Sequence, residues 1–317
     1  MTDLLELLRC PVCTGRVTGD RPLRCLGCGR LYPVVEGIPR LLDDSLPGIA
    51  EKRREIAGWV RKAQAEGWYR EDDEVDAGLP QVSWDDSVWG ANAHSFDALL
   101  HHYVRPGMRV LEVGAAKCWA AQHLLPRGCE YVATDILTDP IIGLGRGAFY
   151  AERVGPFDRV QADGEHLPFA DGEFDLTFCV ATLHHALDLP RMVAELARVT
   201  RRGGIVAALN EGVRTVGASA DAPGQRAEKE LGINEHVHTV WAYVWCFLRA
   251  CLVVRRVAPS DGEYPDLGRA GALFRLPRGD LWASLYAYTR TPNANYTGIS
   301  VYASRLPTLR VRAGGSR

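Results

Sequence analysis

The sequence predicts an α/β protein with a largely parallel sheet, preceded by a small metal-binding domain. First, apolar runs alternate with helical stretches from Arg109 onward, the order that produces right-handed βαβ units. Second, two Cys-x-x-Cys motifs lie within the first 28 residues. Third, 317 residues suffice for one large domain and a small one.

The two motifs predict a structural zinc site in a first domain over residues 1–45. The candidate ligands are Cys10, Cys13, Cys25 and Cys28. Two tight turns with this spacing present four thiolates to one tetrahedral zinc ion and leave no position for water. Ordinary buried cysteines and a redox dithiol are the competing interpretations, although a dithiol needs only one motif. So short a segment buries too little surface to fold alone, and metal binding would supply the missing stability.

The residues around these cysteines add a resemblance. LLELLRCPVC and LRCLGCGRLYPVVEGIPRLL are similar to the zinc-ribbon activator family that partners tRNA, rRNA and release-factor methyltransferases. The resemblance covers about residues 2–42. In that family the ribbon is a separate subunit packed on a methyltransferase, whereas here it continues into a longer chain.

Residues 46–106 are expected to form a helical linker that caps a cofactor pocket. In EKRREIAGWVRKAQAEGWYRE, Ile56 and Val60 are four residues apart with Trp59 beside them, which indicates one charged helix. The acidic run REDDEVDAG is interpreted as a solvated turn. SFDALLHHYV indicates a further helix, started by a Ser95 cap, that leads into the next domain.

The third segment, residues 107–310, contains the predicted strands. They are RVLEVG, EYVATDI, DRVQAD, FDLTFCV, a strand within ARVTRRGGIVAALNEG, and GISVYASR at the end. Acidic residues close four of them: Glu112, Asp135, Asp163 and Glu211. Because parallel sheets bind ligands at the carboxyl ends of their strands, these acids predict a ligand site at that edge.

The turn after the first strand indicates which ligand to expect. A dinucleotide needs a G-x-G-x-x-G turn, but only Gly114 of that pattern is present, which counts against NAD. Asp135 follows Glu112 by 23 residues, near the spacing of about 20 at which an acid binds ribose hydroxyls. A nucleoside cofactor without a diphosphate fits both facts. S-adenosylmethionine, with its ribose and cationic sulfonium, is the candidate.

The motifs VLEVG, YVATDI, QADGEHLPFADGEFDLTFCVATLHHALD and ARVTRRGGIVAAL resemble the class I S-adenosylmethionine-dependent methyltransferases, in particular the ubiquinone-methyltransferase-like branch. The resemblance covers about residues 105–212. It implies a Rossmann-like fold with a mostly parallel, seven-stranded sheet. It also implies that Asp135 binds the ribose hydroxyls and that Asp163 and Gly164 bind adenine. The implied cofactor-binding residues are Glu112, Gly114, Ala115, Lys117, Asp135, Ile136, Asp163, Gly164, Cys179 and Val180.

The sequence departs from that family at Ala116 and Cys118, where the family usually has glycines. Each adds a Cβ where the backbone normally passes close to the cofactor. A degenerate cofactor loop is therefore the alternative to ordinary cofactor use.

Candidate catalytic residues follow the fourth and fifth strands: His184, His185, Glu211 and His236. A histidine with a pKa near neutrality suits the removal of a proton from a methyl acceptor. Histidines without a base role, or at a helix cap or the surface, are the alternatives. Insertions at about 213–240 and 258–298 are expected to select the acceptor. Residues 311–317 are expected to be a basic tail.

The composition of the chain favours some classes of function over others. The net charge of −2 lacks the basic signature of nucleic-acid binding, although it does not forbid it. No stretch approaches the roughly 18 apolar residues of a membrane span. Nine cysteines without an export signal indicate the cytoplasm. The sequence therefore predicts an S-adenosylmethionine-dependent methyltransferase for an O or N atom of a small molecule, a sugar or secondary metabolite. The alternatives are an rRNA or tRNA methyltransferase and a non-catalytic binding module.

Overall fold

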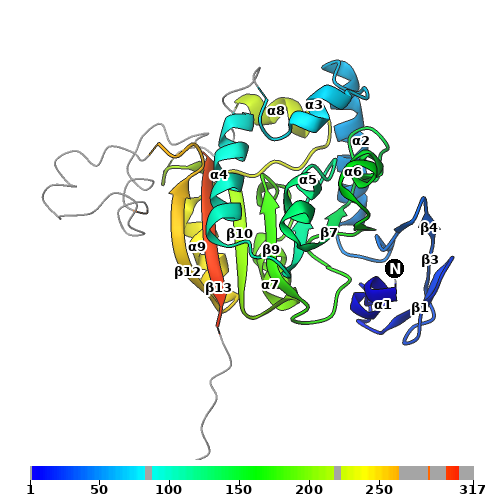
Figure 1. The fold of residues 1–317 in the computed structure, drawn as a ribbon. Helices are drawn as coiled ribbons and strands as arrows, with labels where there is room; N and C mark the ends of the chain where they lie inside the picture. Colours follow the sequence, from blue (N-terminus) through cyan, green and yellow to red (C-terminus); the bar gives the residue numbers. More distant parts are fainter. Residues whose placement is uncertain (1, 83–87, 218–222, 264–284, 286–297, 307–317) are drawn as a thin grey trace, which may run out of the picture.

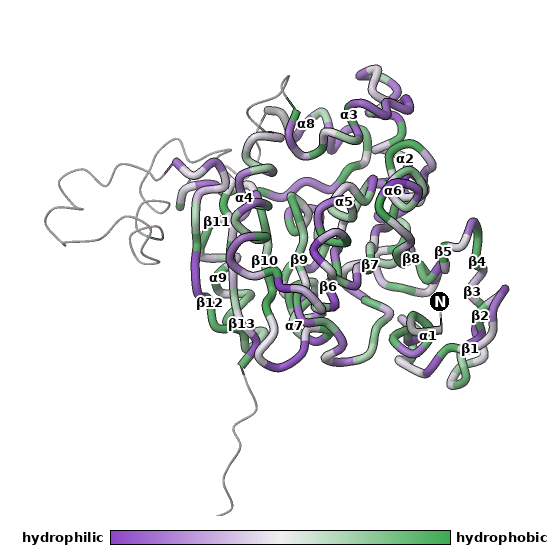
Figure 2. The backbone as a smooth tube through the Cα atoms, in the orientation of Figure 1, coloured by the Kyte–Doolittle hydropathy of each residue, from purple (hydrophilic) through white to green (hydrophobic). Residues whose placement is uncertain are grey.

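The computed structural model describes residues 2–82, 88–217, 223–263, 285 and 298–306. A twisted sheet lies at the centre, with helices on both faces (Figure 1). Hydrophobic residues concentrate on its central strands (Figure 2). The expected aromatic insertion at 258–298 falls mostly outside the described residues, and the basic tail at 311–317 falls wholly outside them. Within those residues, no helix has the length and apolar character that crossing a membrane requires.

The predicted fold class is confirmed. The main sheet has the order β12-β13-β10-β9-β6-β7-β8, with the short β11 paired to β10. The pairs among β6 to β10 are parallel, and β13 is antiparallel to both of its neighbours. The strands are β6 (Arg109–Val113), β7 (Glu130–Asp135), β8 (Asp158–Gln161), β9 (Phe174–Val180), β10 (Thr200–Arg214), β11 (His238–Thr239), β12 (Leu252–Pro259) and β13 (Gly298–Arg305).

This strand order creates a switch point. From β6 the chain adds β7 and β8 on one side and then returns to place β9 on the other side of β6. Loops after β6 and β9 therefore diverge at the carboxyl edge, where ligands of open α/β sheets bind. Glu211 lies inside β10, which continues to Arg214, so the expectation that Glu211 closes its strand is wrong.

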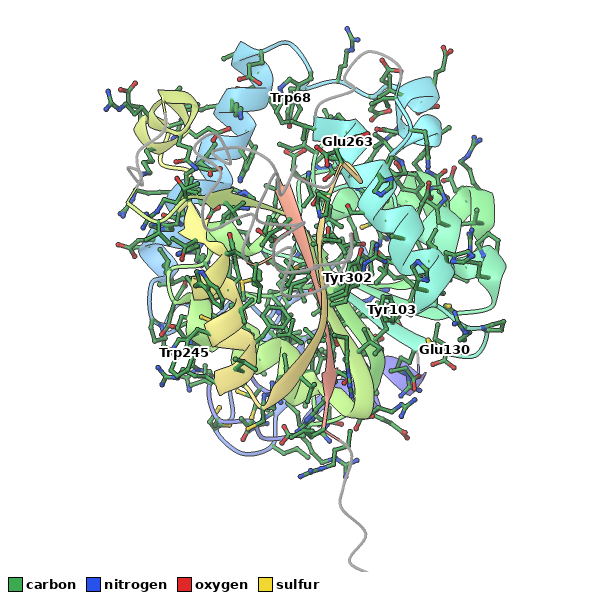
Figure 3. All side chains as sticks on the ribbon, turned by 90° about the vertical axis from the view of Figure 1, so that its left-hand side faces the viewer. Trp68, Tyr103, Glu130, Trp245, Glu263 and Tyr302 are labelled. Carbon is green, nitrogen blue, oxygen red and sulfur yellow. The ribbon has the colours of Figure 1, made fainter. Side chains whose placement is uncertain are left out.

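Two helical layers cover the sheet. The helices α4 (Val88–His102), α5 (Ala121–Leu124) and α6 (Gly147–Val154) pack in one layer, and α7 (Leu189–Val199) and α9 (Val240–Arg249) pack in the other. Tyr103, just after α4, stacks on Tyr302 of β13 with ring centroids 5.0 Å apart (Figure 3). The expected Ser95 cap is wrong, because Ser95 lies inside α4 and its hydroxyl donates to the Ala91 carbonyl at 2.7 Å.

The linker is helical, as expected, and one of its segments departs from the prediction. It contains α2 (Ile49–Ala65) and α3 (Asp73–Gly78). The acidic run forms α3 instead of a solvated turn, because Asp72 caps that helix by accepting from the Val75 N–H and the Asp76 side chain of the helix is buried. The helix α8 (Pro223–Glu230) lies across from α2 at the top of the molecule (Figure 1).

The cysteine-rich segment attaches to the edge of the main sheet. It contains α1 (Thr2–Leu7), β1 (Val17–Gly19), β2 (Leu23–Cys25), β3 (Leu31–Tyr32), β4 (Val34–Val35) and β5 (Ile38–Pro39). The Arg9 N–H donates to the Pro168 carbonyl at 2.8 Å, and the Leu41 N–H donates to the Gln161 carbonyl, at the end of β8, at 3.0 Å. Side chains from both parts share one hydrophobic core, so the segment is packed firmly on the α/β domain.

Candidate functional site

The four predicted zinc ligands come together. One sulfur from each of the four lies within 4.8 Å of the others: Cys10, Cys13, Cys25 and Cys28. Cys10 and Cys28 Sγ are 3.7 Å apart, and Cys13 and Cys25 Sγ are 3.4 Å apart. Four sulfurs bound at about 2.3 Å to a tetrahedral zinc ion stand about 3.8 Å apart. The cluster fits a structural zinc ion.

The surroundings of the sulfurs support this fit. The N–H groups of Gly27 and Cys28 point at Cys25 Sγ from 3.3 and 3.4 Å, as expected around a thiolate. A Cβ on Gly15 would lie 3.1 Å from Cys25 Sγ, and one on Gly27 would lie 3.2 Å from Cys13 Sγ. Both turns therefore need glycine to bring the backbone this close to the sulfurs.

The loop after β6 adopts a left-handed backbone that favours glycine, although two of its residues are not glycine. Gly114, Ala116 and Cys118 all have positive φ, at 78°, 42° and 67°. The left-handed region costs an L-residue other than glycine about 1–2 kcal/mol. The loop therefore has the expected course, at a cost in strain at Ala116 and Cys118.

Asp135, at the end of β7, faces this loop. One carboxylate oxygen accepts from the Ala116 N–H and the other from the Leu137 N–H, each at 2.8 Å. Each oxygen keeps a further lone pair, as a pair of ribose hydroxyls requires. Burial raises the pKa of Asp135 despite these N–H donors. Asp135 thus fits the predicted ribose site.

Glu112 differs from its predicted place in the cofactor loop. It is 1% exposed, and the Tyr131 hydroxyl donates to its carboxyl group. Burial raises its pKa to about 8, so the carboxyl group is largely protonated at neutral pH.

Asp163 is also enclosed. Its carboxylate accepts from the Glu165 N–H at 3.0 Å, contacts His166 Nδ1 at 3.0 Å, and lies 3.7 Å from Lys52 Nζ of α2. Burial would raise the pKa of Asp163, but His166 and Lys52 hold it below its usual value. Gly164 packs against Met192. The Asp163 carboxylate, which the resemblance assigns to adenine, is therefore already bound by groups of the protein.

The other predicted cofactor residues differ in exposure. Four of them are half-buried, namely Gly114, Lys117, Ile136 and Val180. Ala115 and Cys179 are buried. The Lys117 ammonium donates to Asp76 at 2.8 Å, so it holds α3 against the loop instead of standing free.

The predicted acceptor-side residues form a buried network. Both oxygens of Glu211 accept from the segment after β9: Oε1 from the N–H groups of Thr182 and Leu183 at 2.9 Å, and Oε2 from His184 Nδ1 at 2.8 Å. His236 is linked through its backbone, since its N–H donates to the His184 carbonyl at 3.0 Å while its side chain is exposed. The four predicted residues therefore do not all point into one site.

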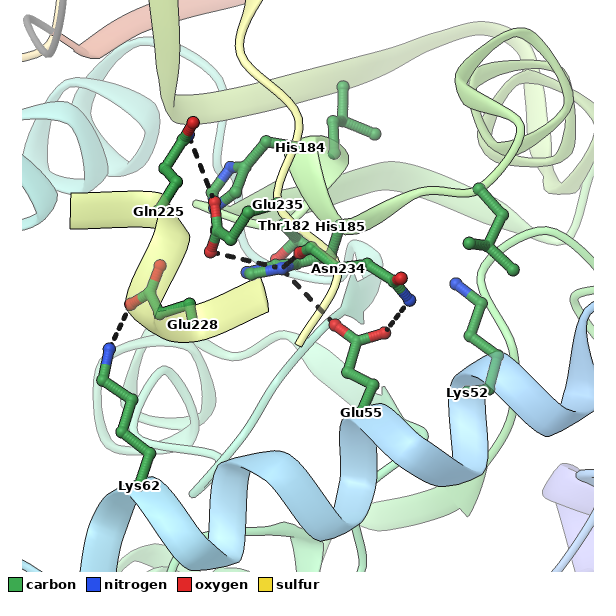
Figure 4. Close-up of polar contacts among 12 residues, drawn as sticks. Lys52, Glu55, Lys62, Thr182, His184, His185, Gln225, Glu228, Asn234 and Glu235 are labelled. Atoms are coloured by element: carbon green, nitrogen blue, oxygen red, sulfur yellow. Dashed lines mark hydrogen bonds and ion pairs between the residues drawn. The ribbon is translucent and has the colours of Figure 1, made fainter. Parts of the chain in front are cut away.

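His185 is surrounded by groups from elsewhere in the chain (Figure 4). Its Nδ1 donates to the Asn234 carbonyl at 2.5 Å and lies 3.4 Å from Glu55 Oε1 and 3.6 Å from Glu235 Oε1. Asn234 Nδ2 in turn donates to Glu55 Oε2 at 2.8 Å. The helix α2 thus contributes directly to this site.

The two histidines differ in pKa because their surroundings differ. Burial would lower the pKa of His184, but its bond to Glu211 outweighs burial and raises the pKa to about 9. Burial and the charge of His184 hold the pKa of His185 well below its usual value. Burial raises the pKa of Glu55 to about 7 and that of Glu235 to about 8. Neither histidine has the near-neutral pKa that suits a general base, so that role stays a prediction.

Sequence reasoning missed Lys52, Glu55 and Glu235 as site residues. A signal for the first two exists: Lys52 lies four residues before Ile56 and Glu55 four residues before Trp59, on a side of α2 where a solvated charge is not expected. Glu235 has no comparable local signal.

Two family models match this chain. Residues 111–208 match a model described as a methyltransferase domain, and residues 2–37 match one described as a Trm112p-like protein. The chain carries a methyltransferase domain. Its N-terminal segment is a Trm112p-like zinc ribbon, so both predicted resemblances are confirmed. The predicted cofactors, S-adenosylmethionine and a structural zinc ion, agree with these matches.

Relatives of the methyltransferase domain differ in what they act on. Sterol 24-C-methyltransferase of Gibberella zeae is 31% identical over 128 residues, 36% of this chain and 33% of that protein. Malonyl-[acyl-carrier protein] O-methyltransferase of Erwinia billingiae is 32% identical over 103 residues, 32% of this chain and 38% of that protein. The matches thus span little more than a third of either relative's length.

Solved structures share the fold of the methyltransferase domain. Geranyl diphosphate C-methyltransferase from Streptomyces coelicolor A3(2) has a TM-score of 0.53 at 15% identity, covering 83% of this chain and 100% of that one. The [4+2]-cyclase SpnF has a TM-score of 0.52 at 16% identity, covering 81% and 95%.

Proposed function

We propose that this chain transfers a methyl group from S-adenosylmethionine to an oxygen or nitrogen atom of a small molecule. One observation carries the proposal: the cofactor loop touches the segment that holds the histidine pair. A Cβ on Gly114 would overlap the side chain of Thr182, two residues before His184. A donor bound at Gly114 and Asp135 therefore lies next to the groups assigned to the acceptor.

The charges of the acceptor side favour a small neutral or cationic molecule. Glu55, Glu211 and Glu235 are at most 6% exposed and surround the histidine pair. A site lined by three carboxyl groups offers little attraction to a phosphate backbone. A whole-chain charge of −2 supplies no compensating attraction. These features support a small acceptor over rRNA or tRNA.

The proposed residue roles follow from the contacts. S-adenosylmethionine supplies the methyl group on a cationic sulfonium. Asp135 holds the ribose, and the loop from Gly114 to Cys118 supports the donor. His184 and His185 lie on the acceptor side, and Glu211 fixes the ring of His184. Alignment of the two reactants is itself a large contribution to rate. The acceptor gains the methyl group and loses one proton.

The test has two stages. Calorimetric titration measures binding of S-adenosylmethionine, which we expect at one site per chain. Production of S-adenosylhomocysteine is then measured with a panel of small hydroxyl and amine acceptors and, separately, with total tRNA and rRNA. Turnover with a small acceptor supports the proposal. Turnover only with RNA, or no binding of S-adenosylmethionine, contradicts it.

A further inference from the structure

A second cluster of metal-ligating side chains lies beside the cofactor loop. One ligand atom from each of His184, His185 and Glu235 lies within 4.8 Å of the other two. Glu235 Oε1 is 4.0 Å from His184 Nε2 and 3.6 Å from His185 Nδ1. Ligands bound at about 2.1 Å to a tetrahedral ion stand about 3.4 Å apart. Small side-chain rotations would bring these three atoms onto one ion.

A further carboxyl group, that of Glu55, lies beside His185 but outside the group of three mutually close ligand atoms. Its Oε1 lies 3.4 Å from His185 Nδ1, and its Oε2 is fixed by the Asn234 amide at 2.8 Å. The four side chains come from α2, from the segment after β9 and from the segment after α8, and they converge in Figure 4. Such convergence of distant segments is typical of a built site.

Several acceptor oxygens converge on His185. Three oxygens face His185 Nδ1, and its single N–H is donated to the Asn234 carbonyl at 2.5 Å. The neighbouring ammonium groups are engaged: Lys52 with Asp163 and Glu165, and Lys62 with Glu228. The buried carboxyl groups of Glu55 and Glu235 lie beside the two histidines, and a metal ion between these groups would stabilise the charged carboxylates.

Glu211 fixes the ring of His184 through the ring nitrogen that does not face Glu235. Its carboxylate accepts the Nδ1–H of His184, which leaves Nε2 of that ring directed toward Glu235. Metal-binding histidines usually donate their other ring N–H to a carboxylate or a backbone carbonyl in this way. Glu211 is itself anchored by three backbone N–H groups, those of Thr182, Leu183 and His184, so the ring orientation is set by the fold.

We propose that His184, His185 and Glu235 bind a divalent first-row transition metal ion, distinct from the ribbon zinc, with the Glu55 carboxyl group beside it. Imidazole nitrogens with carboxylate oxygens suit Zn²⁺, Mn²⁺ or Fe²⁺. An ion on His185 Nδ1 takes the place of the proton now donated to Asn234. The role of this ion rests on the proposed function. It would bind the acceptor oxygen and lower the pKa of that hydroxyl group, so that the proton leaves to water before methyl transfer.

Metal stoichiometry tests the proposal on the full chain. After dialysis against Zn²⁺ and removal of loose ions, elemental analysis is expected to give two ions per chain, one of them in the ribbon. Glu235→Gln should reduce the count to one, and Glu55→Gln, which removes a nearby negative charge, should weaken retention of the second ion. Glu228→Gln changes a nearby carboxylate outside the donor set and should leave two.

Cobalt separates the two sites by spectroscopy. Co²⁺ on the ribbon cysteines gives thiolate charge-transfer absorption, whereas Co²⁺ on the histidine cluster does not. One ion per chain in the unaltered protein, or two ions retained in Glu235→Gln, overturns the proposal. Binding of S-adenosylmethionine is measured on the same samples. If it persists beside a single ion, only the metal site fails, and the proposed function stands.

Discussion

The carboxylate of Asp76 accepts a 2.7 Å hydrogen bond from Nε of Arg146, which lies 70 residues further along the chain. Asp76 has no exposed surface, and its other oxygen accepts from the Lys117 ammonium at 2.8 Å. One residue of the acidic run therefore ties α3 to both the cofactor loop and the segment before α6. This link is what makes the linker part of the cofactor domain.

Replacing Asp76 should be far more costly than replacing its exposed neighbour. Asp76→Asn leaves two cations without their buried counter-charge, and we expect a loss of about 3 kcal/mol in the free energy of unfolding. Asp73 also binds Arg146, but its side chain is 71% exposed. Asp73→Asn should cost less than about 1 kcal/mol. Urea denaturation of both variants checks this, and equal losses would contradict it.

Glu112 predicts a pH dependence of stability. Its pKa rises from 4.5 to about 8 on folding, so the folded protein binds more protons between these values. The free energy of unfolding should therefore fall with rising pH across this window, by up to about 1.4 kcal/mol per pH unit from this group. Glu112→Gln removes the effect, so its advantage over the unaltered protein should grow from pH 5 to 8. Denaturation at several pH values measures it, and a constant difference would be inconsistent with a buried carboxyl group.

Ala116 is predicted to be strained. It is exposed and has a φ of 42°, so glycine relieves strain there without loss of packing. Because glycine also makes the unfolded chain more flexible, we expect Ala116→Gly to gain at most about 1 kcal/mol of stability. Ala115 is buried and has no positive φ, and Ala115→Gly should destabilise by about 1 kcal/mol. Thermal unfolding compares the pair, and similar losses in both would refute the strain.

Loss of the ribbon zinc should be local at first. Cys13→Ser removes one of the four thiolates and should release the ion, since metal and folding are coupled in such small units. The β6–β10 strands should persist, because their core does not depend on the metal. Elemental analysis and hydrogen exchange provide the readout. Cys129→Ser, a buried cysteine outside the cluster, is the control and should keep its zinc.

Asp135 should decide cofactor affinity. Asp135→Ala removes the carboxylate at the ribose position, and binding of S-adenosylmethionine should weaken by about 1.5–3 kcal/mol. Asp175 lies near the start of β9, at the opposite edge of the sheet, and accepts from the Arg109 N–H. Asp175→Ala should leave affinity unchanged. Calorimetric titration compares them, and an unaltered affinity in Asp135→Ala would mean that the ribose lies elsewhere.

The zinc ligands and most strands were readable from the sequence because their signals are local. Cys10 to Cys28 lie within two short turns, and the predicted runs FDLTFCV and GISVYASR match β9 and β13 residue for residue. The strand β12 was missed, although it is an edge strand of the main sheet. Its LVVRRVAP sequence contains two arginines and so lacks the continuous apolar pattern of the central strands.

Only some of the residues around His184 and His185 could be predicted from the sequence. His184 and His185 follow a predicted strand, so topology placed them at the right edge of the sheet. Glu55 was not predicted there, because its contact with Asn234 joins residues 179 positions apart. In the sequence it appears as one charge among many on a polar helix.

The sequence by itself determined the zinc ligands, the alternation of parallel strands with helices and the place of Asp135 at the end of a strand, since each depends on turns and periodicities within a few residues. Only the tertiary structure decided which charged side chains are buried. Lys52, Glu55 and Asp76 carry the composition of a solvated linker, and they lie inside because α2 and α3 pack over the carboxyl edge of the sheet. Burial of a charge requires a counter-charge, and here each partner comes from another part of the chain.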